Sequence, residues 1–306
     1  MKPTSHWIRW LLIIFVLLFW MARASTGVLV VYPDAKEPYQ QAFEQIMTGL
    51  AVMVKEPVQR QKTSATTTPA ELRKWLEIAD PSSTVVLLGK LSLDLYLQSS
   101  STRSVVVSAV AVIPQHPRIS GLSLITDPAL YLEVLREIQP NLQRVIVYYN
   151  DTDRQGIERL ERAAKGLEVE SIPITNRADL TYKVGQTLER KDWKTTVLWF
   201  QHSTLSLNPD LLFEYVVKES WERDIMVVSE TLAQVRGGFL LAFYTDFEQY
   251  GQELGEFIQR QAKSDKAIIE FSHRSALALN IRMAQHLGLT LPLSLIQQAK
   301  RIFPEP

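Results

Sequence analysis

Residues 119–150, ISGLSLITDPALYLEVLREIQPNLQRVIVYYN, contain the point at which one α/β pattern ends and a second begins. Asp127 is a good N-cap residue, and Pro128 fits the first helical turn because the N–H that it lacks needs no partner there. These two residues predict a helix over 127–138. The β-branched and aromatic run over 144–150 then predicts a buried strand that ends at Asn150. A new series of strands and helices therefore starts within this stretch.

The same alternation continues on both sides of it. On the N-terminal side, the residue pattern predicts strands over 27–33, 83–89 and 103–113, and helices over 37–54, 69–79 and 91–98. On the C-terminal side, it predicts strands over 168–174, 195–201, 224–230 and 237–244, and helices over 153–166, 177–190 and 208–220. Apolar strands separated by helices indicate parallel sheets that are covered on both faces. We therefore expect an α/β fold with two Rossmann-like lobes.

The N-terminus has the pattern of a secretory signal. Lys2 and Arg9 precede an uncharged run of 13 residues, 10–22, and Ala22-Arg23-Ala24 supplies a small-x-small cleavage site. The run is shorter than the ~20 residues that span a bilayer comfortably. A cleaved signal peptide over 1–24, or an uncleaved inner-membrane anchor over 8–22, would each place the rest of the chain in the periplasm. A buried core helix is the third interpretation of the run.

Charge and cysteine content exclude several classes of function. The chain has 33 basic and 33 acidic residues, and the leader holds Lys2, Arg9 and Arg23 but no acid. Without the leader the formal net charge is −3, which disfavours nucleic acid as a partner, because nucleic-acid binding needs a basic face. The sequence has no cysteine, which excludes disulfides, thiol nucleophiles and thiolate metal sites.

The common catalytic and cofactor-binding motifs are absent from the sequence. No GxGxxG follows a strand, and neither GxxxxGK[ST] nor HExxH occurs. Residues 121–125, GLSLI, lack the second glycine of a nucleophile elbow. The five histidines show no metal-ligand spacing, and the scattered carboxylates are more typical of a solvated surface than of a catalytic dyad. The sequence therefore predicts a protein that is not an enzyme and that uses no cofactor or metal.

Polar residues follow the predicted strands on the edge where parallel strands end. Open α/β sheets bind ligands beyond the carboxyl ends of their strands, and two facing sheets would form a cleft between the lobes. The candidate ligand-binding residues are Tyr32, Asp34, Lys90, Ser108, Asn150, Asp151, Gln201, His202, Ser229, Glu230, Tyr244 and Asp246. Lys90 could hold a ligand carboxylate or be an ordinary surface lysine. Each of the others could instead serve a turn, a helix cap or the local backbone.

Three stretches of the chain carry a family resemblance. Residues 119–150 carry it through Gly121, Pro140, Arg144, Val145 and Asn150, and residues 237–261 through Gly238, Tyr244, Asp246, Phe247 and Gly251. Residues 279–302, two short helical patterns separated by a turn, carry it through Asn280, Ala284, Leu287, Gly288, Leu289, Pro292, Ser294, Leu295 and Ala299. Taken in order, these stretches resemble ABC transporter substrate-binding proteins of the type I periplasmic binding fold.

The resemblance implies two lobes joined by a three-crossing hinge, with crossings near 112–126, 244–248 and 268–277. It implies a first lobe of residues 25–118 plus 247–268 and a second lobe of residues 119–246 plus 269–306. It also implies ligand capture by hinge closure and delivery to a membrane permease. The segment AKSDKAIIEF (262–271) and the first-strand loop YPDAKEPY (32–39) depart from the family pattern, so the identity of the ligand cannot be carried over.

We therefore expect the periplasmic solute-binding component of an ABC importer. Its partners would be a small organic ligand, such as an amino acid or similar metabolite, and the permease and ATPase complex; the protein itself would be a monomer. The alternative is a membrane-tethered ligand-sensing module that presents its closed form to a receptor or sensor kinase. A distant alternative is an extracytoplasmic α/β hydrolase that uses His202 with Glu230 or Asp246. The secretory leader disfavours a cytoplasmic repressor.

Overall fold

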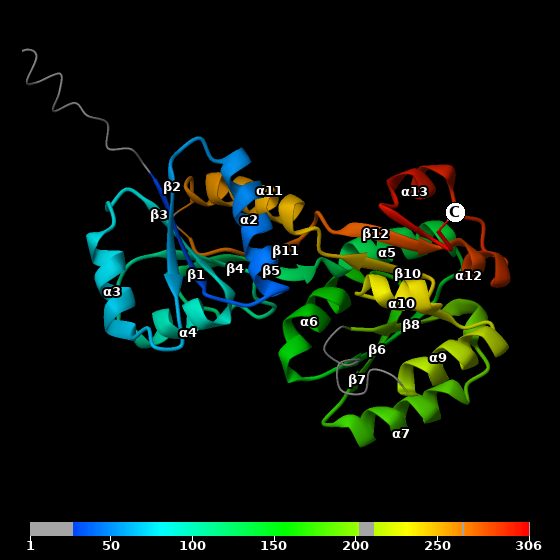
Figure 1. Ribbon diagram of the computed structural model, residues 1–306. Helices are drawn as coiled ribbons and strands as arrows, with labels where there is room; N and C mark the ends of the chain where they lie inside the picture. Colours follow the sequence, from blue (N-terminus) through cyan, green and yellow to red (C-terminus); the bar gives the residue numbers. More distant parts are fainter. Residues whose placement is uncertain (1–26, 202–210, 265, 306) are drawn as a thin grey trace, which may run out of the picture.

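The computed structural model describes residues 27–201, 211–264 and 266–305, which form two α/β lobes, each with its own sheet (Figure 1). The expected fold class is therefore confirmed. The predicted leader and His202 lie outside these residues. Within the described ranges, no helix is both long enough and apolar enough to cross a membrane.

The first lobe contains a six-stranded sheet in the order β11-β5-β4-β3-β1-β2, in which every strand pair is parallel. Its strands are β1 (Val28–Pro33), β2 (Val58–Thr63), β3 (Thr84–Leu88), β4 (Val105–Ser108), β5 (Ile119–Thr126) and β11 (Ile269–Ser272). Its helices are α2 (Tyr39–Met53), α3 (Pro69–Ile78), α4 (Gly89–Gln98) and α11 (Phe247–Gln261). Helices α2 and α11 pack on one face of the sheet, and α3 and α4 on the other.

The second lobe contains a seven-stranded sheet in the order β13-β12-β10-β9-β8-β6-β7, which is parallel except where β10 pairs with β12. Its strands are β6 (Arg144–Tyr149), β7 (Glu168–Pro173), β8 (Thr196–Phe200), β9 (Met226–Ser229), β10 (Leu241–Tyr244), β12 (Ala276–Asn280) and β13 (Arg301–Phe303). Its helices are α5 (Pro128–Ile138), α6 (Arg154–Ala163), α7 (Arg177–Leu188), α9 (Leu211–Glu222), α10 (Leu232–Gly237), α12 (Ile281–His286) and α13 (Leu293–Gln298). Short 3-10 turns, η1 (Asp151–Asp153) and η2 (Trp193–Thr195), precede α6 and β8.

The expected division into lobes is wrong for two strands. Residues 119–126 and 269–272 were expected in the second lobe, but they form β5 and β11 of the first sheet. The physical reason is the strand pairing: β5 pairs with β4 from Val105 to Ser108, and β11 then adds to the free edge of β5. The chain therefore changes lobes after β5, between β10 and α11, and between β11 and β12.

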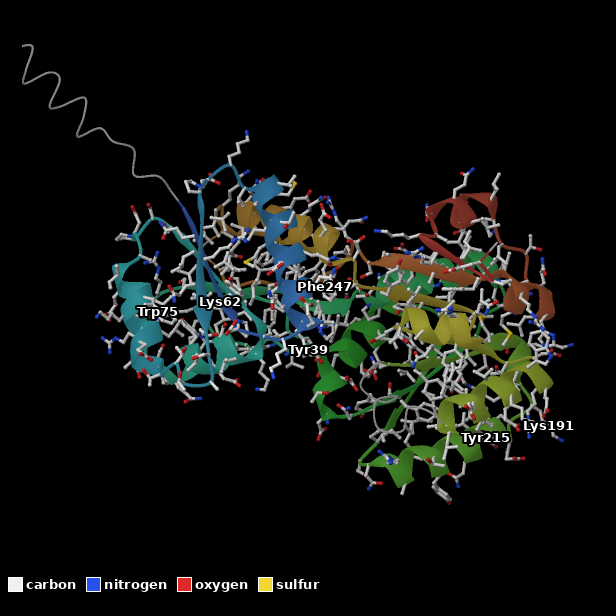
Figure 2. All side chains as sticks on the ribbon, viewed as in Figure 1. Tyr39, Lys62, Trp75, Lys191, Tyr215 and Phe247 are labelled. Atoms are coloured by element: carbon white, nitrogen blue, oxygen red, sulfur yellow. The ribbon has the colours of Figure 1, made fainter. Side chains whose placement is uncertain are left out.

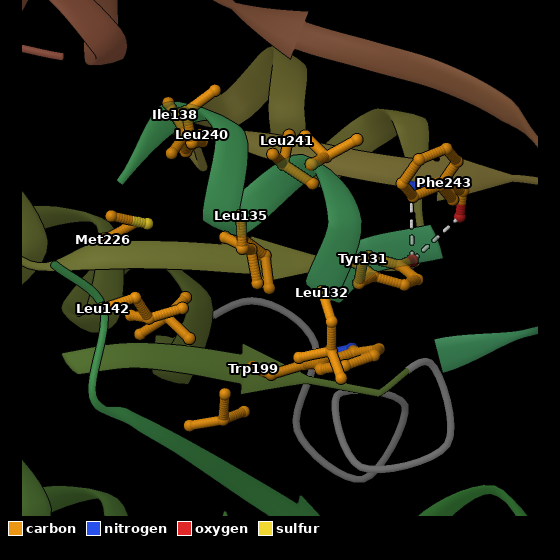
Figure 3. Close-up of a cluster of buried hydrophobic side chains, with 14 of the residues drawn as sticks. Tyr131, Leu132, Leu135, Ile138, Leu142, Trp199, Met226, Leu240, Leu241 and Phe243 are labelled. Atoms are coloured by element: carbon orange, nitrogen blue, oxygen red, sulfur yellow. Dashed lines mark hydrogen bonds between the residues drawn. The ribbon is translucent and has the colours of Figure 1, made fainter. Parts of the chain in front are cut away.

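Buried apolar side chains fill both faces of each sheet. Figure 3 shows the part of the second-lobe core that lies under α5, where Leu132 and Leu135 are buried beside Trp199. The predicted caps form here as expected: the Asp127 side chain accepts a hydrogen bond from the backbone N–H of Ala129 at 2.9 Å. The capped helix α5 is therefore the first element of the second lobe and begins directly after the first crossing.

Candidate functional site

A pocket of about 380 Å³ lies between the two lobes, beside the crossings. Its lining residues are Ala111, Leu124, Ile125, Thr126 and Phe247 from the first lobe, and Glu230, Thr231, Leu232, Phe243, Tyr244 and Thr245 from the second lobe and its second crossing. Figure 2 labels Phe247 at the place where the two lobes meet. Most of the lining is apolar, and a few polar groups converge on it, which is the usual composition of a small-molecule site.

Strand ends explain why these residues meet. Strands β5, β9 and β10 all finish at the edge of their sheet that faces the other lobe, at Thr126, Ser229 and Tyr244. The residues that follow them enter the crossings or the next helix. In open α/β sheets this carboxyl edge is where ligands bind, so the pocket has the location that the fold predicts.

Two of the predicted site residues, Glu230 and Tyr244, line the pocket. Glu230 is half-buried and directly follows β9. Burial raises the pKa of the Tyr131 hydroxyl well above its ordinary value, and the negative charge of Glu230 raises it further. Burial also raises the pKa of the Tyr244 hydroxyl, although Lys300 and Arg301 oppose this effect. Among the described lining residues, Glu230 is the one with a charged side chain.

Other predicted residues have structural partners. The buried Ser108 hydroxyl donates to the carbonyl oxygen of Leu122 at 3.2 Å. The Asn150 side chain caps η1 by accepting from the backbone N–H of Thr152 at 2.8 Å. The Asp246 carboxylate caps α11 and also pairs with Lys300. These contacts agree with the local-backbone and helix-cap interpretations.

Three charged candidates form ion pairs within their own lobe. Asp34 pairs with Lys62 at 3.1 Å, Lys90 with Asp94 at 3.0 Å, and Asp151 with Arg154 at 3.0 Å. None of these six residues is in the lining of the pocket. The Lys90 side chain is 82% exposed, which agrees with the surface-lysine interpretation.

The remaining described candidates, Tyr32, Gln201 and Ser229, do not belong to the lining of the pocket. The Tyr32 ring packs beside Phe43, with ring centroids 6.5 Å apart. Gln201 is buried against α6, and a Cβ atom on Gly156 would lie 3.7 Å from its Nε2. Ser229 is fully buried; its carbonyl oxygen accepts from the Tyr131 hydroxyl at 2.8 Å.

Sequence reasoning missed the apolar lining and the residues of the crossings. Thr126 precedes the first crossing, Thr245 belongs to the second, and Phe247 directly follows the second as the first residue of α11. Their signal in the sequence was their position beside the predicted crossings, because a pocket at a hinge must be lined partly by the hinge itself. Leu124 and Phe243 are apolar strand residues, and no local pattern separates them from the core.

A polar network connects the crossings next to the pocket. The Asp127 carboxylate accepts three hydrogen bonds from the Arg159 guanidinium, one at 2.6 Å and two at 3.0 Å, and lies 3.6 Å from the His273 Nε2. The Thr126 and Ser275 hydroxyls are 2.6 Å apart, which joins the first crossing to the third. These contacts link the first crossing to the third.

A larger cavity, of about 560 Å³, lies on the outer side of the second lobe beside Trp221, Arg236 and Arg282. All its lining residues come from that lobe. Movement of the lobes could therefore not close it, so the smaller pocket between the lobes is the better candidate site. Among the described residues, no group of three or more histidine, aspartate or glutamate side chains could hold a metal ion.

Comparison with known proteins supports the fold. No family model and no curated protein matches the sequence. Among solved structures, the chain is similar to a substrate binding protein with adhesive properties from Clostridium difficile in its ligand-free, open form, with a TM-score of 0.62 and 16% identity over 90% of this chain and 98% of that one.

Two further solved structures have a similar arrangement. One is an ABC domain in complex with L-Trp from Streptococcus pneumonia, with a TM-score of 0.55 and 16% identity over 91% of this chain and 100% of that one. The other is a periplasmic ribose ABC transporter from Conexibacter woesei, with a TM-score of 0.54 and 10% identity over 91% of this chain and 100% of that one. With two α/β lobes, three crossings and a pocket between them, this chain has the type I periplasmic binding protein fold.

Proposed function

We propose that this protein is the solute-binding component of an ABC importer and captures a small organic ligand between its two lobes. The observation that carries the proposal is the pocket between the lobes, whose walls come from both of them. A ligand in this pocket would contact both lobes at once, so it would bind a closed arrangement more tightly than an open one. Differential affinity of this kind is what drives closure about a hinge.

Short crossings suit such a movement. Two residues, 245 and 246, connect β10 to α11, and residues 273–275 connect β11 to β12. A few residues at element ends are sufficient to absorb the backbone rotation of hinge closure. The permease and ATPase complex would then recognise the closed form. The proposed location is the periplasm, in agreement with the secretory pattern of residues 1–24, and the proposed role is binding without catalysis.

A ligand screen by thermal unfolding tests the proposal. A ligand present at about 100 times its Kd stabilises the folded state by about 2.7 kcal/mol, which a melting curve resolves easily. We expect the radius of gyration, measured by X-ray scattering, to fall when the ligand is added. If no compound from a broad metabolite panel raises the melting temperature, the proposal is wrong.

A pair of variants links any binding to the pocket. Ala111→Trp adds an indole to an exposed position in the pocket lining and should abolish binding while the protein remains folded. Val52→Trp adds the same group to an exposed position on α2 outside the lining and should leave binding unchanged. Mass spectrometry of the N-terminus tests the location: a chain beginning at Ser25 indicates free periplasmic protein, and an intact leader indicates a membrane-tethered protein.

A further inference from the structure

The cavity of about 560 Å³ on the second lobe, which we call the outer cavity, is remote from the pocket between the lobes. Its lining comes from helices α9, α10 and α12 and from the ends of strands β12 and β13 (Figure 1). Strand β12 runs antiparallel to β10, so Asn280 at the end of β12 lies at the sheet edge opposite to Tyr244. The outer cavity is therefore at the edge of the second sheet that faces away from the first lobe.

Part of the lining of the outer cavity is apolar and well packed. Val217, Met283 and Phe303 contribute to it, and Met283 and Phe303 are buried. The volume lies within the range of about 300–1,000 Å³ that is usual for small-molecule sites. These side chains offer contact to the apolar body of one small organic molecule.

Trp221 forms an aromatic wall of the outer cavity. It is 41% exposed, although its ring stacks on the His286 imidazole with centroids 3.7 Å apart and planes inclined by 9°. The His286 Nε2 lies 2.7 Å from the Trp221 carbonyl oxygen and 3.2 Å from the Asp224 carboxylate. These contacts hold the indole in place before any ligand arrives, which reduces the entropy that binding would cost.

Two exposed arginines, Arg236 and Arg282, line the same cavity. The Arg282 guanidinium carbon is 5.3 Å from the centroid of the Trp221 ring, a cation–π contact. Stacking on a ring leaves the N–H groups in the guanidinium plane able to donate, and one carboxylate can accept two of them side by side. Among the described residues, neither arginine forms an ion pair, whereas Lys218 of the lining pairs with Glu222 at 3.7 Å.

The charges of the lining match a ligand with one negative charge. The described lining has three cations, Lys218, Arg236 and Arg282, and two acids, Glu222 and Glu305, which is an excess of one positive charge. A single carboxylate would neutralise this excess. A phosphate monoester, which carries nearly two negative charges at pH 7, would exceed it.

We propose that the outer cavity is a second ligand site, which binds a flat aromatic carboxylate. The aromatic body would contact Trp221 and Phe303, and the carboxylate would accept hydrogen bonds from Arg282 and Arg236. All the lining residues belong to the second lobe, so binding here does not require the lobes to close. The inference is therefore independent of the function proposed for the pocket between the lobes.

Acids and their uncharged amides test this inference. We would use the full chain with Ala111→Trp, which blocks the pocket between the lobes, and titrate it by calorimetry. The probes are indole-3-acetate and benzoate, each compared with its amide, indole-3-acetamide or benzamide. Each acid should bind with a stoichiometry of one and at least tenfold more tightly than its amide, because the amide lacks the charge that the guanidinium groups recognise.

Variants of the two arginines place this binding in the outer cavity. Arg282→Gln and Arg236→Gln should each weaken acid binding at least tenfold, whereas Arg162→Gln, which removes an exposed arginine of α6 outside the lining, should have no effect. The two arginines are exposed and lie on different helices, so one variant remains informative if thermal melts show that the other disturbs folding.

Three results would overturn the inference: no binding of either acid, equal binding of acid and amide, or unchanged acid binding in both arginine variants. None of them bears on the proposed function, because the pocket between the lobes is blocked throughout. Conversely, failure of the metabolite panel on the unchanged chain to reveal a ligand of that pocket would leave the outer cavity to be judged by these titrations alone.

Discussion

Helices α5 and α11 enter the two lobes in the same way. Each begins directly after a crossing, with an aspartate at the N-cap and a buried tyrosine four residues later: Asp127 and Tyr131 in α5, Asp246 and Tyr250 in α11. The Tyr131 hydroxyl donates to the carbonyl oxygen of Ser229 at the end of β9, at 2.8 Å. The Tyr250 hydroxyl donates to the carbonyl oxygen of Leu122 in β5, at 2.7 Å. Both tyrosines thus tie a helix to a strand near the edge that faces the cleft.

The two helices differ in how they pack beyond this shared beginning. Helix α11 lies so close to α2 that a Cβ atom on Gly251 would be 2.1 Å from the carbonyl oxygen of Ile46. Helix α5 instead presents large side chains: the Tyr131 and Trp199 ring centroids are 4.1 Å apart, and Leu135 is fully buried. Helix α11 is therefore held by close backbone contact with α2, which glycine permits, whereas α5 is held by the packing of large side chains. The first lobe should be sensitive to added atoms, and the second to removed atoms.

The largest effect is expected from removing volume under α5. Leu135→Ala should lower the free energy of unfolding by about 4 kcal/mol, because it leaves a cavity in the second-lobe core that the neighbours cannot fill. Urea unfolding followed by circular dichroism measures this change. Leu97→Ala, at a side chain of α4 that is 48% exposed, is the control and should cost about 0.5 kcal/mol or less. Equal costs for both variants would contradict the packing of α5.

Adding one methyl group should have the next largest effect. Gly251→Ala should cost about 3 kcal/mol, since its Cβ would meet the backbone of α2, which cannot rotate away as a side chain can. Gly185→Ala in α7 is the matched control, because nothing lies within 4 Å of its Cβ position. That variant should be neutral or more stable by up to about 1 kcal/mol, because alanine favours helix more than glycine does. A tolerated Gly251→Ala would show that α2 and α11 are not in close backbone contact.

Removing the hydroxyl group of Tyr131 or of Tyr250 should lower the free energy of unfolding by a moderate and similar amount. Tyr131→Phe and Tyr250→Phe should each cost about 2 kcal/mol, because each leaves buried hydrogen-bonding groups without a partner while the ring is kept. Tyr182→Phe, at a ring that is 65% exposed, is the control. Thermal melts of the three variants test the equivalence of α5 and α11. A large cost in only one lobe would mean that the two tyrosines are not equivalent.

The smallest effect concerns the cap of α11 and depends on pH. Burial raises the pKa of the Asp246 carboxyl, but the hydrogen bond from Lys300 and the N-cap contacts outweigh burial, so the pKa lies below its ordinary value. A lowered pKa in the folded state contributes stability above the ordinary aspartate pKa of about 3.9, and this contribution is lost as the pH falls through the lowered value. Asp246→Asn should therefore cost about 1 kcal/mol at pH 7.

The pH dependence distinguishes this charge effect from a loss of packing. The difference in unfolding free energy between Asp246→Asn and the unchanged chain should shrink as the pH is lowered below the ordinary aspartate range. Urea titrations across that range measure it. A difference that stays constant would mean that the asparagine disturbs the cap itself and that the charge is unimportant.

Much of the secondary structure could be predicted from local sequence. Asp127 with Pro128 predicted the start of α5, and the apolar runs predicted β6, β8 and β9. The strand predicted over 103–113 is shorter in the structure and ends at Ser108, before Ala109 adopts a left-handed conformation at φ 56°. The Ala109 backbone N–H lies 3.3 Å from the Tyr250 hydroxyl, a contact from a distant part of the chain that local reasoning could not supply.

The candidate site was only partly predictable. Polar strand ends were the right place to search, and Glu230 and Tyr244 were found in this way. The other strand-end candidates could not be separated from them in advance, because a side chain such as Asn150 or Asp246 can satisfy a helix end instead of a ligand. Phe243 and Phe247 were missed because aromatic residues in and beside a strand are usually part of the core.

The sequence by itself determined the α/β alternation, the helix caps and the existence of two lobes, since these depend on residues that are close together in the chain. Only the tertiary structure decided which sheet receives β5 and β11, and which polar strand ends reach the pocket. The physical reason is that a buried strand has the same apolar pattern in either sheet. Its partner is chosen by hydrogen bonding and packing with segments up to about 150 residues away, as the 2.6 Å contact between Thr126 and Ser275 illustrates.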